Sequence, residues 1–373
     1  MHHPIHVLCV MSTLDRGGSE SMVMSLFRCI DRTKIMFDFV KHTSKTGAYE
    51  EEILNLGGRI FEAPRYNLYN HIQYVSWWKR FLLQHPEYLI IHGHFFTISG
   101  VYFAVAKSCG RITVGHSHST ETVSDWKRRP VHHIVSNYYV SQIEKYSDYA
   151  LACSNKAGNW LFKNKKFVVL NNAIDCERFR FNENKRNEYR RMFDLGNEIV
   201  VGTVANISNV KNPMGLLDIF IALKALKPKS KLIWVGGGDG KAEVENRIKK
   251  ENIEESVIML GRRDDVADIL QAMDAFLLPS YNEGLPVSVI EAQSAGLPCY
   301  ISNRVTKEVD ITGLCHFLPI EQPDNWAEKW ANIIVNDRTC RKDVSALIRE
   351  SGYDIQTTSN WLEGFYLSIY PNE

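Results

Sequence analysis

The sequence predicts an α/β protein of two doubly wound, Rossmann-like domains that face each other across a cleft. At 373 residues the chain is longer than one ordinary hydrophobic core accommodates. Short, nearly continuous apolar runs alternate with amphipathic segments, as expected for parallel strands covered by helices on both faces. The alternation begins again after a polar stretch at 173–196, which we expect to be a hinge and a poor core segment.

Each domain contributes a series of predicted strands. The expected strands are 5–11, 88–94, 111–116, 149–154 and 167–172 in the first domain, then 198–206, 231–237, 256–261 and 274–280 in the second. The domain boundaries follow as 1–172 and 173–353. The last segment, about 354–373, is predicted to form a helix that docks on the N-terminal domain. Because ligands bind beyond the carboxyl ends of such strands, site residues are expected in the loops there.

Composition restricts the partners and the compartment. Lys and Arg number 44 and Asp and Glu 43, without the basic excess typical of nucleic-acid binding. The eight cysteines include no C-x-x-C pair, which favours reduced thiols in the cytoplasm. The N-terminus does not have the pattern of a signal peptide, and no apolar run reaches the ~18 residues that cross a bilayer. Any membrane contact is therefore expected to be peripheral, on the inner face of the cell membrane.

Two familiar nucleotide motifs and one hydrolase motif do not fit. The stretch "VGGGDGKA" has Lys241 where a dinucleotide fingerprint needs glycine and Ala242 where a P-loop needs Ser or Thr. The stretch "GHSHS" has Ser119 where the last glycine of a nucleophile elbow belongs. A glycine turn after a strand remains as the interpretation of the first stretch.

Four histidines form two H-x-H pairs at strand ends: His92, His94, His116 and His118. Alternation along a strand places each pair on one face, a pattern compatible with metal ligands. No Asp-x-Asp motif accompanies them to hold a metal-bound diphosphate. The sequence therefore predicts neither a metal nor another cofactor.

The stretch "SYNEGLPVSVIEAQSAGLP" (280–298) has the most informative spacing, with Glu283 and Glu291 eight residues apart. Pro286 suits the first turn of a helix that follows a buried strand. The free amides of that turn would bind a phosphate, and the two carboxylates would accept hydrogen bonds from hydroxyls beside it. Alternatively, Ser288 and Glu291 form a capping box, and Glu283 is an ordinary loop charge.

These residues resemble glycosyltransferase family four. The resemblance lies in Pro-Ser-x-x-Glu-Gly-x-Pro, the second glutamate eight residues later and the following Ala-x-x-x-Gly-x-Pro. The Gly17-Gly18 loop, "TVGHSH", "NNAID", "VGGGDG" and "MLGRRDDV" extend it over nearly the whole chain. Members have the GT-B fold and retain anomeric configuration. The chain looks closest to enzymes of bacterial exopolysaccharide and capsule assembly.

The resemblance implies a role for each matching residue. Glu283 would bind hydroxyls of the donor sugar, Glu291 the ribose hydroxyls and Lys211 the diphosphate, while His116 would contact the sugar near its reacting carbon, with His118 as the alternative. The further donor-site positions are Gly17, Gly18, Asn206, Gly238, Gly261, Arg262, Arg263, Gly284, Leu285 and Pro286. The implied donor is a nucleotide sugar, UDP-linked, and the acceptor is a glycan or a polyprenyl-linked glycan.

One position departs from the family pattern. Members usually carry arginine five residues before the lysine, where this chain has Asn206. A lysine cannot replace the fork of an arginine, so Arg262 or Arg263 is a candidate to compensate. Two alternatives remain open: a non-catalytic subunit that binds nucleotide sugar, and a nucleotide-sugar epimerase of the same architecture.

Two basic and aromatic segments suggest peripheral membrane contact. Trp77 and Trp78 precede Lys79 and Arg80, and "DWKRRP" adds the cations at 127–129. Amphipathic segments of this kind can lie at a lipid surface, where a lipid-linked acceptor is found. The alternative is that Trp77, Phe81 and Leu82 pack inside the N-terminal domain.

Overall fold

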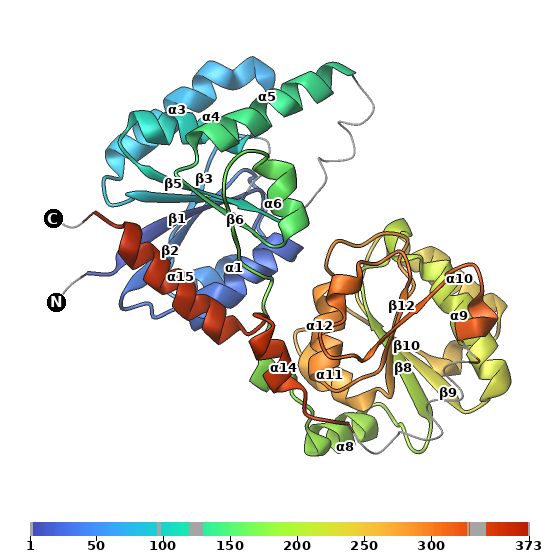
Figure 1. Cartoon of the computed structure of the whole chain (residues 1–373). Helices are drawn as coiled ribbons and strands as arrows, with labels where there is room; N and C mark the ends of the chain where they lie inside the picture. The colour runs from blue at the N-terminus through green and yellow to red at the C-terminus, as the bar shows by residue number, and fades with distance from the viewer. Residues whose placement is uncertain (1–2, 95–97, 119–129, 327, 329–340, 372–373) are drawn as a thin grey trace. The chain divides into compact units, whose positions relative to one another are not determined.

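The structure, a computed structural model, describes residues 3–94, 98–118, 130–326, 328 and 341–371. The chain divides into two compact units (Figure 1). The N-terminal unit contains residues 1–173 and 355–373, and the C-terminal unit contains residues 174–354.

The N-terminal unit contains a seven-stranded sheet in the order β3-β2-β1-β4-β5-β6-β7, and every pairing is parallel. Its strands are β1 (Ile5–Met11), β2 (Ile35–Lys41), β3 (Ile60–Glu62), β4 (Ile90–Gly93), β5 (Ile112–Ser117), β6 (Tyr149–Ala152) and β7 (Val168–Val169). Its helices are α1 (Gly18–Cys29), α2 (Glu50–Asn55), α3 (His71–Gln84), α4 (Ser99–Ser108), α5 (Pro130–Tyr146), α6 (Asn155–Leu161) and α15 (Ile355–Ile369), with a 3-10 turn at Leu68–Asn70.

Helices cover both faces of this sheet (Figure 1). Alternate residues of β1 point to opposite sides: Val7 and Cys9 pack toward α1 and α15, whereas Leu8 and Val10 pack toward α3, α4 and α5. Helix α15 buries Leu362 on the first of these faces. The predicted docking of the C-terminal helix on the N-terminal domain is therefore confirmed.

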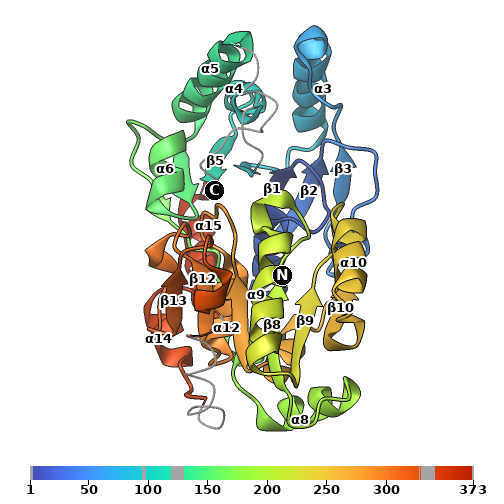
Figure 2. The same cartoon turned by 90° about the vertical axis from the view of Figure 1, so that its right-hand side faces the viewer.

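The C-terminal unit contains a six-stranded parallel sheet in the order β10-β9-β8-β11-β12-β13. Figure 2 labels β8, β9, β10, β12 and β13 of this sheet. Its strands are β8 (Ile199–Val204), β9 (Ser230–Val235), β10 (Val257–Gly261), β11 (Ala275–Leu278), β12 (Cys299–Ser302) and β13 (Cys315–Leu318). Its helices are α7 (Cys176–Phe179), α8 (Glu183–Met192), α9 (Pro213–Leu226), α10 (Lys241–Lys250), α11 (Val266–Ala272), α12 (Val287–Ser294) and α14 (Ser345–Glu350), with 3-10 turns at Asn209–Lys211, Glu254–Ser256 and Lys307–Val309.

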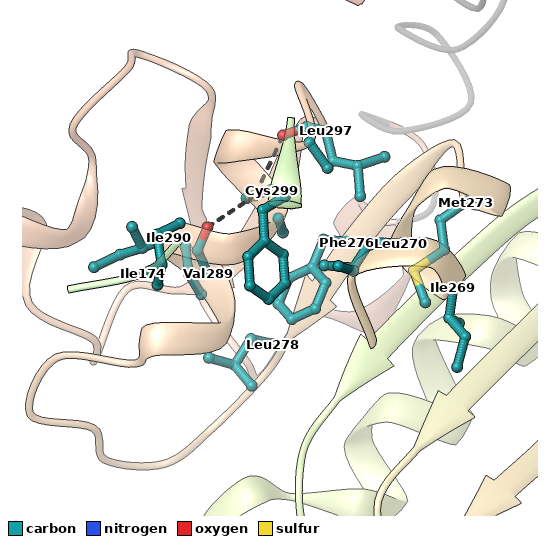
Figure 3. Close-up of a cluster of buried hydrophobic side chains, with 14 of the residues drawn as sticks. Ile174, Ile269, Leu270, Met273, Phe276, Leu278, Val289, Ile290, Leu297 and Cys299 are labelled. Atoms are coloured by element: carbon teal, nitrogen blue, oxygen red, sulfur yellow. Dashed lines mark hydrogen bonds between the residues drawn. The ribbon is translucent and has the colours of Figure 1, made fainter. Parts of the chain in front are cut away.

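This sheet too is buried on both faces. Phe276 and Leu278 of β11 pack with α11 and α12 in the cluster of Figure 3, whereas Ala275 and Leu277 face the cluster that contains α9 and α10. Alternation of buried residues on both sides accounts for the continuous apolar runs in the sequence. The predicted class, two doubly wound α/β domains, is confirmed.

Each sheet has one point at which the strand order reverses. In the N-terminal unit it lies between β1 and β4, and in the C-terminal unit between β8 and β11. Helices on either side of such a point diverge, so the loops beyond the carboxyl ends of these strands form the ligand crevice of doubly wound sheets. A ligand site is therefore expected at the loops after β1, β4, β8 and β11.

Two sequence expectations need correction. Strands β2, β3, β12 and β13 were not predicted; β2 has Asp38 at its centre, where this buried carboxylate accepts hydrogen bonds from Arg59 and Tyr88. The expectation that 173–196 is a poor core segment is wrong. That stretch forms α7 and α8, whose residues Phe179 and Tyr189 pack in the core of the C-terminal unit.

Two further features concern membranes and thiols. Among the described residues, no helix is long and apolar enough to cross a membrane. The seven cysteines within those residues are all free thiols.

Candidate functional site

The loops after β8 and β11 are joined at the reversal point of the C-terminal sheet. The Tyr281 amide donates to the Val210 carbonyl (2.8 Å), and Asn212 Nδ2 donates to the Pro279 carbonyl (3.1 Å). The Lys211 ammonium then forms an ion pair with the Glu283 carboxylate. Two predicted site residues that are 72 positions apart are thus in direct contact, because β8 and β11 are adjacent strands.

Asn212 holds this arrangement and was missed by sequence reasoning. Its backbone is left-handed (φ 53°), and its side chain caps α9 by accepting from the Gly215 amide at 3.1 Å. Pro213 occupies the first turn of that helix. Asparagine tolerates this conformation better than most residues and is a favoured cap. An Asn-Pro pair directly after the lysine was the signal that could have identified it.

Glu291 lies in α12, whose start differs from both sequence interpretations. Pro286 occupies the N-cap position, one residue before the helix, and no side chain caps it. Ser288 lies inside the helix, so the capping-box alternative is wrong. No described residue donates a hydrogen bond to the partly buried Glu291 carboxylate. Burial raises the pKa of Glu291 to about 7, opposed only by the charge of Arg178.

The glycines after β9 allow two loops to pack backbone against backbone. Ile207 donates its amide to the Gly237 carbonyl at 2.9 Å. A Cβ at Gly236 (φ 141°) would lie 2.0 Å from the Ala205 carbonyl oxygen, and one at Gly238 (φ 155°) would lie 2.3 Å from that of Ile207. Close packing against the loop after β8 therefore explains these two glycines. This agrees with the interpretation of the stretch as a glycine turn after a strand.

The arginine pair after β10 separates into two different environments. Arg263 forms a bidentate ion pair with Asp265 (2.8 and 2.6 Å), and Tyr189 donates to the same carboxylate at 2.8 Å. Arg262 is exposed and forms no ion pair with any residue that the structure describes. The Arg262 Cγ would lie 3.6 Å from a Cβ placed on Gly237. The Gly237 carbonyl accepts from the amide of Ile207, the residue after Asn206. Of the two guanidinium groups, only that of Arg263 is thus held by an ion pair among the described residues.

The remaining predicted donor-site residues have varied surroundings. Gly284 is exposed, and a Cβ there would meet no atom within 4 Å. Leu285 packs against the core of the C-terminal unit. Gly261 ends β10 in a left-handed conformation (φ 64°), and its carbonyl accepts from the Gly236 amide at 2.7 Å.

The glycine loop of the N-terminal unit surrounds an acid to which sequence reasoning assigned no role. Gly17 precedes α1, and a Cβ there would lie 2.4 Å from Glu20 Oε2, whereas Gly18 has open space around it. The buried Glu20 carboxylate accepts from the hydroxyls of Ser19 (2.8 Å) and Thr13 (3.1 Å). Its place in the first turn of the helix was the available signal.

The four predicted histidines come together at the ends of β4 and β5. Ring centroids lie 4.1 Å apart within each H-x-H pair, and His92 and His94 lie 5.4 and 5.3 Å from His116. Burial lowers the pKa of all four, in the case of His118 to about 3, so the imidazoles are neutral. The expected sharing of a face within each pair is confirmed.

Helix α3 contains the first of the two segments considered for membrane contact. Phe81 and Leu82 are buried in the core of the N-terminal unit, and Trp77 packs partly buried against that core, which confirms the packing alternative for these three residues. Trp78 is buried in the same core. Trp77 stacks on Phe81 and lines a hollow of about 520 Å³ together with the end of β3 and the loops that follow β2 and β3: His42, Thr43, Ser44, Lys45, Glu62, Ala63, Pro64 and Arg65. Residues 127–129, the second segment, lie outside the described residues.

Comparisons with known proteins agree with this architecture. Residues 16–178 match Glycosyltransferase Family 4, and residues 185–344 match Glycosyl transferases group 1. The putative glycosyltransferase EpsF of Bacillus subtilis is 31% identical over 375 residues, covering 98% of this chain and 96% of that protein. The chain belongs to glycosyltransferase family 4. This family 4 protein is thus a glycosyltransferase of glycan biosynthesis, and the comparisons do not support the epimerase alternative.

Other similarities cover part of the chain or the fold alone. The UDP-Gal:alpha-D-GlcNAc-diphosphoundecaprenol alpha-1,3-galactosyltransferase of Escherichia coli is 34% identical over 142 residues, 37% of each chain. The crystal structure of HepE from Anabaena in complex with UDP-glucose superimposes with a TM-score of 0.77 at 18% identity, over 98% of this chain and 100% of that one. The latter shows that the family 4 chain has the GT-B fold.

Proposed function

We propose that this family 4 enzyme transfers a hexosyl or N-acetylhexosaminyl group from a UDP-sugar to a polyprenyl-linked glycan, with retention of anomeric configuration. The observation that carries the proposal is the contact between Lys211 and Glu283 at the reversal point of the C-terminal sheet. It combines a cation for a diphosphate with a carboxylate for sugar hydroxyls. A galactosyltransferase named for UDP-Gal and a diphosphoundecaprenol acceptor is among the relatives, which supports this donor and acceptor class.

In the proposed reaction, the bond between the anomeric carbon and the UDP oxygen breaks. An acceptor hydroxyl oxygen bonds to that carbon from the same face, and its proton passes to the leaving diphosphate. Negative charge therefore grows on the diphosphate, where Lys211, Arg262 and the free amides at the start of α12 stabilise it. These groups neutralise the diphosphate without a metal ion, so we expect transfer to be insensitive to EDTA.

Glu291 completes the proposed donor site. Its carboxylate accepts no hydrogen bond from the described residues and is desolvated enough to have a pKa of about 7. A desolvated acceptor without a partner is costly in the free protein. Two ribose hydroxyls would provide the missing donors, so part of the donor affinity comes from relieving this cost.

The N-terminal unit offers a matching place for the acceptor. The hollow beside Trp77 has the exposed cations Lys45 and Arg65 on its walls, suited to a diphosphate, and an indole ring on which a sugar can pack. Next to it, α3 and the preceding turn expose Tyr69, Ile72 and Leu83 on the same segment as Lys79 and Arg80. Apolar and cationic side chains side by side on the exposed face of a helix suit an anionic lipid surface. Flotation with anionic vesicles should therefore be lost in an Ile72→Ser, Leu83→Ser variant.

The first experiment is a thermal-shift screen against UDP-, GDP-, ADP- and CMP-sugars, with and without EDTA. A donor at a hundred times its dissociation constant stabilises the native state by about 2.7 kcal/mol. We expect a shift with one or more UDP-sugars only, unchanged by EDTA and much reduced in Glu283→Ala. Nuclear magnetic resonance of the product made from that donor then reads the anomeric configuration.

The outcomes separate the remaining alternatives. A shift confined to another nucleotide would contradict the UDP assignment, and an inverted product would contradict retention. Donor binding without turnover on polyprenyl-linked acceptors would favour the non-catalytic subunit that Asn206 leaves open. Near-normal turnover by Glu283→Ala would remove this residue from the site.

A further inference from the structure

The histidine cluster of the N-terminal unit has a geometry that sugar transfer does not require. His92 and His94 extend from the end of β4, and His116 from the end of the adjacent β5. One ring nitrogen from each of these three side chains lies within 4.8 Å of the other two. A tetrahedral zinc ion with Zn–N bonds of about 2.0–2.1 Å needs nitrogens roughly 3.4 Å apart. Small side-chain rotations therefore suffice to close the site.

In two of the three rings, a hydrogen bond at Nδ1 fixes the orientation of the ring. His92 Nδ1 bonds to the Tyr366 hydroxyl (2.5 Å), and His94 Nδ1 bonds to His118 Nε2 (2.8 Å). With the proton on Nδ1 in each ring, the lone pair on Nε2 is left without a partner. This is the arrangement of metal-ligating histidines, whose second nitrogen donates to a neighbouring acceptor.

The nitrogens that would bind an ion are buried and unsatisfied. Nε2 of His92, Nε2 of His94 and both nitrogens of His116 have less than 1 Å² exposed and no hydrogen-bond partner among the residues that the structure describes. An unsatisfied buried polar group costs free energy, and one such group is seldom found, let alone three in contact. A shared ligand that accepts three lone pairs explains one of these nitrogens on each ring.

We propose that His92, His94 and His116 bind one divalent transition-metal ion of the zinc class. Three imidazoles and no carboxylate favour Zn²⁺, Ni²⁺, Cu²⁺ or Co²⁺ and disfavour Mg²⁺ and Ca²⁺, which require oxygen ligands. The fourth position is left to a water molecule, because His118 Nε2 already accepts from His94 Nδ1. All three ligands belong to the N-terminal unit, and no step of the proposed reaction passes through the ion. A bound ion would occupy the His116 ring to which the family resemblance gives a contact with the donor sugar.

The test measures metal content and not transfer, so its result is independent of the proposed function. Untagged protein is stripped with EDTA, incubated with one equivalent of Zn²⁺, dialysed and analysed by mass spectrometry for zinc. We expect about one zinc per chain, and none in His94→Gln. Co²⁺ should give the visible absorption of a four-coordinate ion in the unmodified protein alone.

One further variant serves as a control, and a second tests the hydroxyl that orients His92. A variant with His2→Gln and His3→Gln removes the N-terminal histidines and should still retain zinc. Tyr366→Phe keeps the ring in the core and removes only the hydroxyl that orients His92. It should weaken zinc affinity by ~10–100-fold, as loss of such outer partners does.

Three results would overturn the proposal. These are no zinc retained by the unmodified protein, zinc retained equally by His94→Gln, or zinc lost with the N-terminal histidines. Circular dichroism and the melting temperature of each metal-free variant show whether it is folded, so that loss of zinc is not confused with unfolding. If His94→Gln does not fold, His116→Gln replaces it with the same expectation.

Discussion

The two units share a strand order, but the side chains at their reversal points are charged in one unit and neutral in the other. At the reversal point of the C-terminal sheet, the loops after β8 and β11 hold an ammonium against a carboxylate, with partly exposed side chains. Near that of the N-terminal sheet, β4 and its neighbour β5 end in four clustered imidazoles that burial keeps neutral. Charged, accessible loops suit a diphosphate, whereas neutral buried nitrogens suit a metal ion. The topology thus locates a site, and the loop residues decide its ligand.

The largest effect expected in the C-terminal unit comes from Lys211→Ala. Removal of the cation leaves the charge on the leaving diphosphate less stabilised, so kcat should fall by ~100–1000-fold. Lys241→Ala, at an exposed position on α10, is the matched control and should leave kcat unchanged. Steady-state kinetics with the identified donor measure both. A fall of less than threefold for Lys211→Ala would show that the diphosphate binds elsewhere.

The arginine pair should separate by function. Arg262→Ala should weaken donor affinity by about 10–100-fold, the range of a hydrogen bond to a charged group. Arg263→Ala should leave the affinity nearly unchanged, because its guanidinium is occupied by Asp265. Isothermal titration of the two variants provides the comparison. Equal losses in both would mean that the Asp265 pair opens on binding and that Arg262 has no special place.

The smallest effect is a pH dependence of donor binding. Because burial raises the pKa of Glu291 to about 7, its carboxyl is mostly protonated at pH 6 and mostly ionised at pH 8. The ionised form accepts from both ribose hydroxyls, so donor affinity should rise by about tenfold from pH 6 to pH 8. Titration calorimetry across this range should show the rise, and Glu291→Gln should flatten it.

The same residue has the opposite effect on stability. The folded-state pKa of Glu291 is above its unfolded value, so its contribution to the free energy of unfolding is fully present below pH ~4.5. That contribution is lost as pH rises through about 7. In urea denaturation, Glu291→Gln should therefore gain stability relative to the unmodified protein at pH 8 but not at pH 4.5. A flat difference between the two proteins would mean that the carboxyl is not desolvated.

Much of this protein could be predicted from local sequence. Continuous apolar runs at 5–11 and 274–280 predicted buried parallel strands because both faces of such strands lie against helices. The spacing of Glu283 and Glu291 around Pro286 placed one acid in a loop and the other in the helix that follows. A strand with a polar residue at its centre was not predicted in this way. Asp38 interrupts the apolar run of β2, and hydrogen bonds from Arg59 and Tyr88 make the burial of its carboxylate possible.

Only the tertiary structure determined which of these residues meet. Lys211 and Glu283 are in contact because parallel pairing makes neighbours of β8 and β11, whose order no local pattern reveals. The same reason unites the H-x-H pairs of β4 and β5, since a hydrogen-bonded ladder aligns strand ends that are distant in sequence. Local periodicity therefore determined the elements and the chemistry each loop carries, while strand pairing decided which side chains share a site.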